Sequence, residues 1–402
     1  MTQNNQKIPE GWSVKKLGKV INTFSGGTPL AGNPVYYEKG TIPFIRSGEI
    51  YQDYTELFIT EKGLQESSAK MVNKGDLLFA LYGANSGEIA ISKIKGAINQ
   101  AILCIRPKED DINYLKNLFI FLKNRILHKY LQGGQGNLSA EIVKSLNFLL
   151  PPLAEQEKIA EILCTWDEAI EKLSGLIEQK KLLKKGLMQK LLTSKTRLPG
   201  FTQPWKEKKL GDLTCEISKS VGDLNIQTAS ISAKVGFVSQ TEKFGRDISG
   251  AQYNKYTLIE KGDFSYNKGN SKTYPQGCAY RLKDFEMIAV PNVFISFRVK
   301  ENILHPGFIE QFFIGNFHGK LLRKVITSSV RDNGLLNLSV KDFFGIPINL
   351  PTDIKEQQAI ADVLSAADDE INLLNQKLEA LKAQKKGLMQ KLLTGQIRVK
   401  VN

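Results

Sequence analysis

The chain has 402 residues and a formal net charge of +14, from 55 Lys and Arg against 41 Asp and Glu, which favours a polyanionic partner. It has no run of about 18 apolar residues that could span a membrane, and Met1 to Glu10 lack the apolar core of a signal peptide. We therefore expect a cytoplasmic protein. The cysteines are scattered, which favours a reducing compartment over a disulfide framework or a zinc site: Cys104, Cys164, Cys215 and Cys278.

The first globular segment, residues 1–152, alternates short strands with polar loops. A Gly-Gly turn at residues 25–29 precedes a strand at 42–45 that runs into Arg46 and Ser47. Further strands are predicted at 76–80 and 101–106, with a helix at 111–131. Side chains in such loops can read base edges and phosphates, although they are also ordinary loop residues. The candidate DNA-binding residues here are Gly26, Gly27, Thr28, Arg46, Ser47, Tyr82, Asn85, Gln135 and Asn137.

Residues 153–197 are predicted to form a region that contains one long amphipathic helix. Pro151 and Pro152 prevent a helix from continuing out of the upstream segment, and Thr193-Ser194 marks the end. Apolar residues recur about every 3.5 positions, which is typical of a coiled-coil seam. A helix of about 38 residues would be about 57 Å long. The predicted seam residues are Ile159, Leu163, Trp166, Ile170, Leu173 and Ile177.

The second globular segment, residues 198–351, follows the same plan. Strands are predicted at 262–266 and 293–298, and one helix from about Pro306 to Val325. The candidate DNA-binding residues of this segment are Lys219, Ser230, Asn267, Lys268, Asn270, Lys272, Arg331 and Asn333.

Residues 352–402 repeat the long helix. Residues 184–193, KKGLMQKLLT, return unchanged as residues 385–394, and shorter matches recur in the same order along the chain. We interpret this as two copies of one unit related by a pseudo-twofold axis, with the two helices pairing antiparallel. The second seam consists of Ile360, Leu364, Ile371, Leu374 and Leu378.

Lys184 and Lys385 interrupt the apolar seam at equivalent positions. Each could extend its ammonium group to water near the helix end, or each could be a polar seam residue that fixes the register.

Catalytic patterns are missing from the sequence. The three histidines, His128, His305 and His318, have no partners at metal-ligand spacing, and no GxxxxGK[ST] phosphate loop occurs. We therefore expect a binding protein that is not an enzyme and holds neither metal nor cofactor.

The chain resembles the specificity subunits of type I restriction–modification systems. The resemblance is carried by residues 25–29 (SGGTP), 42–48 (IPFIRSG), 137–139 (NLS), 150–156 (LPPLAEQ) and the duplicated helix end. It implies an α+β fold in which target recognition domains, residues 1–152 and 198–351, are separated by conserved helical regions, residues 153–197 and 352–402. The helices would pair as an antiparallel coiled coil.

The resemblance also implies the function and the partners. Each recognition domain would read one half of a bipartite site in double-stranded DNA. The helices would set the gap between the half-sites and bind two methyltransferase subunits, which restriction (motor and nuclease) subunits would join. S-adenosylmethionine, ATP and Mg²⁺ would be cofactors of those partners. Because the second domain lacks the Gly-Gly-Thr-Pro sequence, we expect an asymmetric site. The alternative is a structural adaptor that docks proteins without reading DNA.

Overall fold

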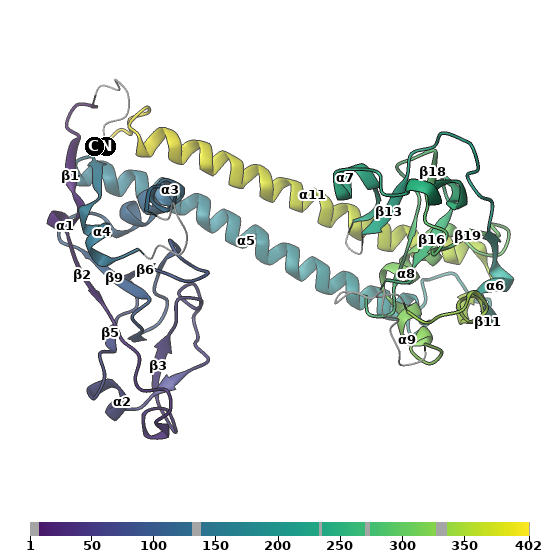
Figure 1. Cartoon of the computed structure of the whole chain (residues 1–402), viewed down its shortest axis with the longest axis horizontal. Coiled ribbons are helices and arrows are strands. Elements are labelled where there is room, and N and C mark those ends of the chain that lie inside the picture. The colour runs from purple at the N-terminus through teal and green to yellow at the C-terminus, as the bar shows by residue number, and fades with distance from the viewer. Residues whose placement is uncertain (1–7, 131–137, 233–234, 270–273, 327–335, 402) are drawn as a thin grey trace. The chain divides into compact units, whose positions relative to one another are not determined.

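The computed structural model of the chain describes residues 8–130, 138–232, 235–269, 274–326 and 336–401, and it separates into two compact units (Figure 1). Unit 1 contains residues 1–174 and 377–402, and unit 2 contains residues 175–376. The two long helices, α5 (Leu153–Leu191) and α11 (Ile354–Leu393), each contribute one part to each unit. Within the described ranges, none of the helices is long and apolar enough to cross a membrane.

Unit 1 is built around an inner antiparallel sheet whose middle strands are mostly apolar and buried. In sheet order its strands are β2 (Ile21–Ser25), β9 (Ile102–Pro107), β6 (Leu77–Ala80) and β7 (Ile89–Ile91). Helix α3 (Ile112–Tyr130) buries Tyr114, Leu115 and Phe119 in the same core. The remaining inner elements are β1 (Ser13–Lys16) paired with β10 (Asn147–Leu150), α1 (Leu17–Val20) and α4 (Ala140–Ser145).

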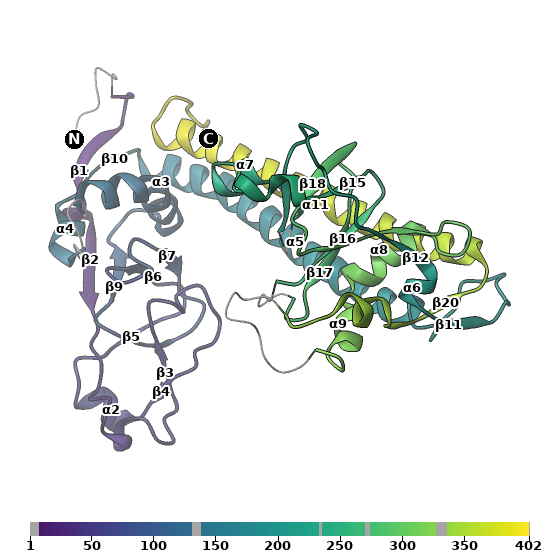
Figure 2. The same cartoon turned by 45° about the vertical axis from the view of Figure 1, so that its right-hand side comes forward.

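An outer sheet of unit 1 lies on the side of the inner sheet that faces away from α5, as Figures 1 and 2 show. In sheet order its strands are β4 (Phe58–Ile59), β3 (Ile42–Ile45), β8 (Gly96–Ile98) and β5 (Lys70–Val72). Two short helices, η1 (Pro34–Tyr36) and α2 (Glu61–Gln65), accompany it.

The Gly-Gly turn joins the two sheets of unit 1. A Cβ atom placed on Gly26 would lie 1.7 Å from the carbonyl oxygen of Ile98, and one on Gly27 would lie 2.5 Å from Cβ of Ser68. Neither glycine needs a positive φ, so the requirement is close backbone approach rather than an unusual turn. The turn is therefore a packing feature, whatever else it contacts.

Unit 2 repeats the inner architecture of unit 1 strand for strand. Its inner sheet is antiparallel, in the order β12 (Thr214–Ile217), β19 (Ile295–Val299), β16 (Phe264–Asn267) and β17 (Cys278–Arg281). The accompanying elements are β11 (Trp205–Lys209) paired with β20 (Pro347–Pro351), α6 (Leu210–Leu213) and α10 (Val340–Phe344). The repeat seen in the sequence is thus a repeat of inner sheet topology.

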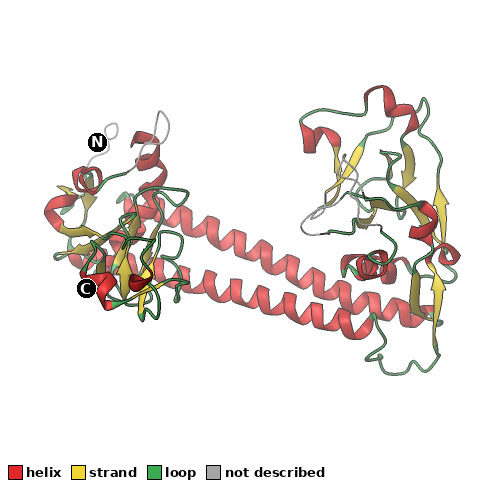
Figure 3. Ribbon diagram, turned by 60° about the horizontal axis from the view of Figure 1, so that its bottom comes forward, coloured by secondary structure: helices red, strands yellow, loops and turns green. Residues whose placement is uncertain are grey.

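The outer part of unit 2 has the same order of strands as that of unit 1, but the strands are linked differently. Figure 3 colours the strands yellow and the loops between them green. A single parallel bridge, Thr228 with Ala289, takes the place of the parallel ladder between β3 and β8 and joins two antiparallel pairs of strands. These are β13 (Ala229–Ser232) with β14 (Gly236–Ser239), and β15 (Thr257–Glu260) with β18 (Met287–Val290). The short helices α7 (Gln240–Phe244) and η2 (Gly250–Lys255) complete it. The two units therefore share an arrangement of strands and differ in the loops and short helices of their outer parts.

The single helix predicted from about Pro306 to Val325 is wrong. The structure has two helices, α8 (Pro306–Ile314) and α9 (Phe317–Leu322). Asn316 takes the left-handed conformation, with φ +54°, and an Asn or Gly in this conformation ends an α-helix. The apolar periodicity continues past the break because both helices pack on the same core.

A buried glutamate fixes the start of each long helix. In unit 1, Glu155 is 2% exposed and accepts hydrogen bonds from the indole of Trp12, at 3.0 Å, and from the guanidinium of Arg398, at 2.7 and 2.8 Å. Strand β1 begins beside Trp12, and Arg398 follows the end of α11. Each of these segments is therefore tied to the first turn of α5.

The same arrangement occurs in unit 2. Glu356, 0% exposed, accepts bonds from the guanidinium of Arg197 at 2.9 and 2.5 Å and from the indole of Trp205 at 3.3 Å. Arg197 and Arg398 are 201 residues apart, as are Glu155 and Glu356. Each glutamate is therefore neutralised by the arginine that follows the other long helix.

The glutamine after each glutamate links the start of its helix to the globular part by hydrogen bonds. The side-chain amides of Gln156 and Gln357 donate to the carbonyls of Pro151 and Pro351, at 3.0 and 2.8 Å. The side-chain oxygen of Gln156 accepts from the backbone N–H of Asp111, and that of Gln357 from the backbone N–H of His305. The Glu-Gln pair is thus a structural anchor.

We predict that Glu356→Gln destabilises the start of α11 by about 2 kcal/mol, the typical value for losing hydrogen bonds to a charged partner. The change keeps the side-chain size but removes the charge that pairs with Arg197. Amide hydrogen exchange over residues 354–364 should become roughly 30-fold faster. Glu379→Gln, whose side chain is 71% exposed on the same helix, is the control and should leave exchange unchanged. Equal rates in both variants would contradict the anchor.

We predict that Gly26→Ala lowers the free energy of unfolding by about 1–3 kcal/mol, because the new methyl group must displace backbone at Ile98. Gly32→Ala is the matched control, since a Cβ on Gly32 meets nothing within 4 Å. Urea denaturation of both variants measures the difference. If Gly26→Ala unfolds at the same urea concentration as the control, the turn is not a packing feature.

Candidate nucleic-acid interface

The predicted DNA-binding residues of unit 1 fall into two groups. Gly26 and Thr28 lie on the turn between the sheets, where the exposed Thr28 hydroxyl donates to Oε1 of Gln100 at 2.6 Å. Arg46 and Ser47 follow β3 of the outer sheet. Asn85 lies on the loop between β6 and β7 of the inner sheet, and its Nδ2 is 3.5 Å from where a Cβ on Gly48 would stand. That these residues bind DNA stays a prediction.

Arg46 is exposed but not unpaired. Its guanidinium bonds Glu49 at 2.8 Å and Glu56 at 2.7 Å. Burial alone would raise the pKa of Glu49, but hydrogen bonds from the side chain and backbone of Arg46 lower it to about 2. Arg46 therefore stays partly neutralised at any ordinary pH, and a DNA phosphate would have to compete with two carboxylates for it.

Tyr82 and its loop lie next to a network that stiffens this part of unit 1. Burial raises the pKa of Tyr82, which follows strand β6. Nearby, Glu88 accepts a hydrogen bond from the hydroxyl of Tyr51 at 2.6 Å and pairs with Lys123 of α3. The loop that carries Asn85 is thus held between Tyr51 and α3.

Two predicted readers in unit 2 have partners inside the protein. Ser230 is 8% exposed, and its hydroxyl accepts from Nζ of Lys243 at 3.2 Å. Asn267 accepts from the backbone N–H of Gly269 at 2.8 Å and donates to the carbonyl of Ile231. Both side chains contribute hydrogen bonds that hold β13 and β16 in place, which gives them a structural role.

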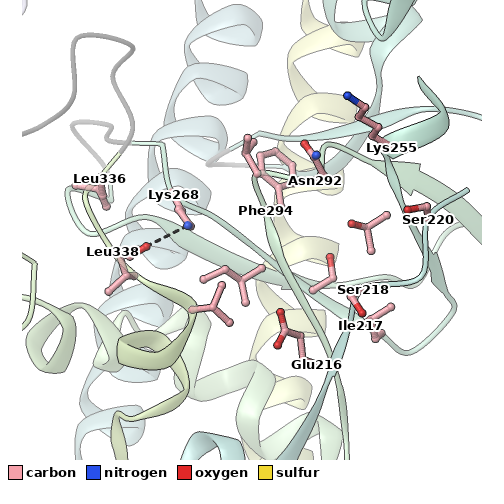
Figure 4. A pocket seen from close by; sticks show the side chains of 15 residues that line it. Glu216, Ile217, Ser218, Ser220, Lys255, Lys268, Asn292, Phe294, Leu336 and Leu338 are labelled. Carbon is pink, nitrogen blue, oxygen red and sulfur yellow. Dashed lines mark hydrogen bonds between the residues drawn. The ribbon is translucent and has the colours of Figure 1, made fainter. Parts of the chain in front are cut away.

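A cleft of about 480 Å³ lies beside the inner sheet of unit 2 (Figure 4). Lys268, a predicted reader, lines it, and its ammonium donates to the carbonyl of Leu338 at 3.0 Å. Ser218 and Ser220, the neighbours of the exposed predicted reader Lys219, also line the cleft. The other polar residues of its wall are Glu216, Lys255, Thr257, Asn292 and Ser296. Hydroxyl, amide and ammonium donors suit contacts with phosphates and base edges.

Six predicted DNA-binding residues lie outside the described residues: Gln135, Asn137, Asn270, Lys272, Arg331 and Asn333. Of the remaining candidates in unit 1, Gly27 is buried and Ser47 is half-buried.

The predicted seam residues of the long helices are buried to different degrees. Buried members are Ile159, Leu163, Leu173, Ile177, Ile360, Leu364, Ile371 and Leu378, whereas Trp166, Ile170 and Leu374 are half-buried. In unit 1, Ile159 and Leu163 share a core with Leu392 of α11, and in unit 2, Leu191 of α5 shares a core with Ile360. The start of one helix therefore packs with the end of the other in each unit.

Lys184 and Lys385 do not extend to water. They are 7% and 9% exposed, and each pairs with an aspartate of the other long helix, Asp368 and Asp167, at 2.5 Å. Of the two interpretations of these lysines, the polar seam residue is the one that their burial and pairing favour.

The charge along the helices predicts the same antiparallel pairing, and the apolar periodicity does not carry this signal. Residues 153–174 carry two lysines and six acids, and residues 354–376 carry one lysine and five acids. Residues 175–191 and 377–393 each carry five lysines and one acid. Antiparallel pairing sets an acidic half against a basic half in each unit, whereas parallel pairing would set like charges together.

The electrostatic balance is the same in both units. Unit 1 has 27 Lys and Arg against 20 Asp and Glu, and unit 2 has 28 against 21, so each carries a net charge of +7. An excess of positive charge divided equally between the units suits a polyanion that both units contact.

Metal chemistry finds no support among the residues that the structure describes, because they contain no group of three or more His, Cys, Asp or Glu side chains placed to hold an ion. His318 is fully buried, and burial lowers its pKa to about 4, so it is a neutral core residue. Its ring contacts Tyr266 and Phe313 edge to face.

Comparisons with known proteins also find a repeat along the chain. The family described as type I restriction modification DNA specificity domain matches twice, at residues 9–180 and 202–383. The type I restriction enzyme MjaVIII specificity subunit of Methanocaldococcus jannaschii is 25% identical over 98% of this chain and 95% of its own length. The EcoKI specificity subunit of Escherichia coli K12 is 22% identical over 88% of this chain and 81% of its own.

Solved structures show the same fold. The S subunit of a type I restriction–modification system from M. genitalium superposes with a TM-score of 0.59 at 17% identity, covering 98% of both chains. A chain from a study of complex assembly in a type I restriction–modification system gives a TM-score of 0.57 at 16% identity. Together with the two family matches, which cover most of the sequence, these likenesses show that the chain belongs to the type I restriction–modification DNA specificity family.

Proposed function

We propose that this chain reads a bipartite, asymmetric site in double-stranded DNA, with one half-site read by each unit. Family membership makes sequence-specific DNA recognition its function and a specificity subunit, not an enzyme, its class. The single observation that carries the bipartite proposal is that the units share one arrangement of strands and carry different loops and short helices in their outer parts. A shared frame suits the same object, B-DNA, and different outer parts suit different base sequences.

The contacts would divide into positioning and readout. Exposed lysines such as Lys219 and Lys255 would hold phosphates, and the loops and the cleft beside the inner sheet would read base edges. The adaptor alternative is disfavoured, because both repeats match a DNA specificity domain and both compact units carry the same net charge of +7.

The long helices would have two tasks beyond holding the cores together. Their length would set the gap between the half-sites, and their outer faces would dock two methyltransferase subunits, which restriction subunits join. One similar solved chain comes from a study of complex assembly in a type I restriction–modification system, which supports this arrangement. In it, S-adenosylmethionine, ATP and Mg²⁺ belong to the partner subunits and not to this chain.

We predict that Lys219→Ala with Lys255→Ala weakens duplex binding and lowers the slope of log affinity against log salt by about 1.8, at about 0.9 for each lost phosphate contact. Titration of a labelled duplex at several salt concentrations gives the slope. The control is Lys172→Ala with Lys382→Ala, which removes the same charge from exposed positions on the helices. An equal change in both double variants would show that only net charge matters.

We predict that inserting one heptad into each long helix lengthens the gap by about three base pairs, because seven residues add about 10 Å of helix and a base pair about 3.4 Å. Selection from duplexes with randomised sequence measures the gap. The half-sites themselves should stay the same. A gap that does not change would refute the helix-length part of the proposal and leave the two readers in place.

A further inference from the structure

Each unit contains one aspartate at which three elements meet. In unit 1, Asp167 of α5 bonds Nζ of Lys385 of α11 at 2.5 Å and lies 3.4 Å from Nζ of Lys116 of α3. In unit 2, Asp368 of α11 bonds Nζ of Lys184 of α5 at 2.5 Å and accepts from Nε2 of Gln311 of α8 at 3.0 Å. We call these two clusters the carboxylate nodes.

The nodes connect the helices to the globular parts. Helices α3 and α8 each follow the last strand of an inner sheet, so Lys116 and Gln311 tie that sheet's unit to the same aspartate that pairs the long helices. Gln311 is 3% exposed, and Lys116 keeps only 16% of its side chain exposed. Each node therefore fixes two relations inside its unit, helix to helix and globular part to helix.

The nodes keep one register in both units. Asp167 and Lys184 are 17 residues apart on α5, and Asp368 and Lys385 are 17 residues apart on α11. Because the helices are antiparallel, both Lys–Asp pairs fit the same register. The apolar seam repeats every heptad, so by itself it would allow the helices to slide by seven residues. Such a slip would set Lys184 opposite Ala361 or Asn375, and Lys385 opposite Ala160 or Ser174. None of these four residues has a charge.

From this geometry we infer that Lys184 and Lys385 are positioning residues that lock the helix register, and through it the gap between half-sites that the chain accepts. The inference rests on the proposed bipartite function. In the native register each buried ammonium meets a carboxylate, and in either slipped register it meets none. A buried lysine without a counter-charge is strongly unfavourable, whereas an apolar seam residue tolerates both registers. The lock therefore contributes specificity of register rather than stability.

The test replaces both seam lysines with methionine, K184M with K385M. Met keeps the length and suits the seam, and the side chains of Asp368 and Asp167 are 36% and 40% exposed, so water can solvate them. The matched control is K172M with K382M, the same substitution at side chains that are 80% and 49% exposed on the same two helices. The probe is a set of duplexes that carry both selected half-sites, with the gap varied one base pair at a time.

We expect the unchanged chain and the control to accept one gap. The K184M/K385M variant should accept a second gap that differs by about three base pairs, because a seven-residue slip moves the helices about 10 Å. Discrimination between the two gaps should fall at least about tenfold in this variant, with the half-sites and the thermal unfolding midpoint of the unbound chain retained. The native gap should stay preferred, because a slip also separates Glu155 from Arg398 and Glu356 from Arg197.

Two outcomes would overturn the inference while the proposed function stands, and a third would overturn the proposed function on which the inference rests. If K184M/K385M keeps a single gap and full discrimination, the lysines do not lock the register. If its unfolding midpoint falls and its affinity drops equally at every gap, they are structural only. If the unchanged chain selects no bipartite site, the proposed function fails, and the inference, which rests on it, fails with it.

Discussion

The fold depends on the contribution of both long helices to each unit. Each globular part packs on the helix that directly follows it, but its core also needs the end of the other long helix. The core of unit 1 takes Met389, Leu392 and Leu393 from α11, and the core of unit 2 takes Met188, Leu191 and Leu192 from α5. An amphipathic helix cannot cover its own apolar side, so each long helix needs the other. Pairing of the helices and folding of the globular parts are therefore one event in each unit.

Charge makes this pairing specific. The buried Glu155 and Glu356 are each neutralised by the arginine that follows the opposite helix, and the carboxylate nodes add a buried lysine from the opposite helix. A lone charge in these places would be costly, and only the antiparallel arrangement supplies every partner. The parts of the sequence that match best between the repeats thus serve the frame, whereas the outer parts of the units are free to differ.

Much of this frame could be predicted from the sequence. Prolines before each long helix and the recurring apolar positions located α5 and α11 within a few residues, because both signals are local. The break at Asn316 was missed because apolar periodicity runs through it. The outer sheets were missed in part because their strands are short and their partners distant in sequence, as in the pairing of β3 with β8.

The candidate interface was less predictable, for a physical reason. A polar loop side chain can contact DNA only if it is not already hydrogen-bonded or ion-paired within the protein. The sequence alone does not show those contacts. Ser230 accepts a hydrogen bond from Lys243, and Arg46 is shared between Glu49 and Glu56. Lys268 lies in a cleft whose walls come from segments as far apart in the sequence as Glu216 and Val340. Tertiary contacts decide which side chains remain available.

The most direct test of the account is to map the modified bases in the genome of a host that carries this chain with its partner subunits. Two units with one inner frame and different outer parts predict a single motif made of two unlike half-sites at a fixed gap. A contiguous motif, or two identical half-sites in palindromic arrangement, would contradict the claim that each unit reads its own sequence.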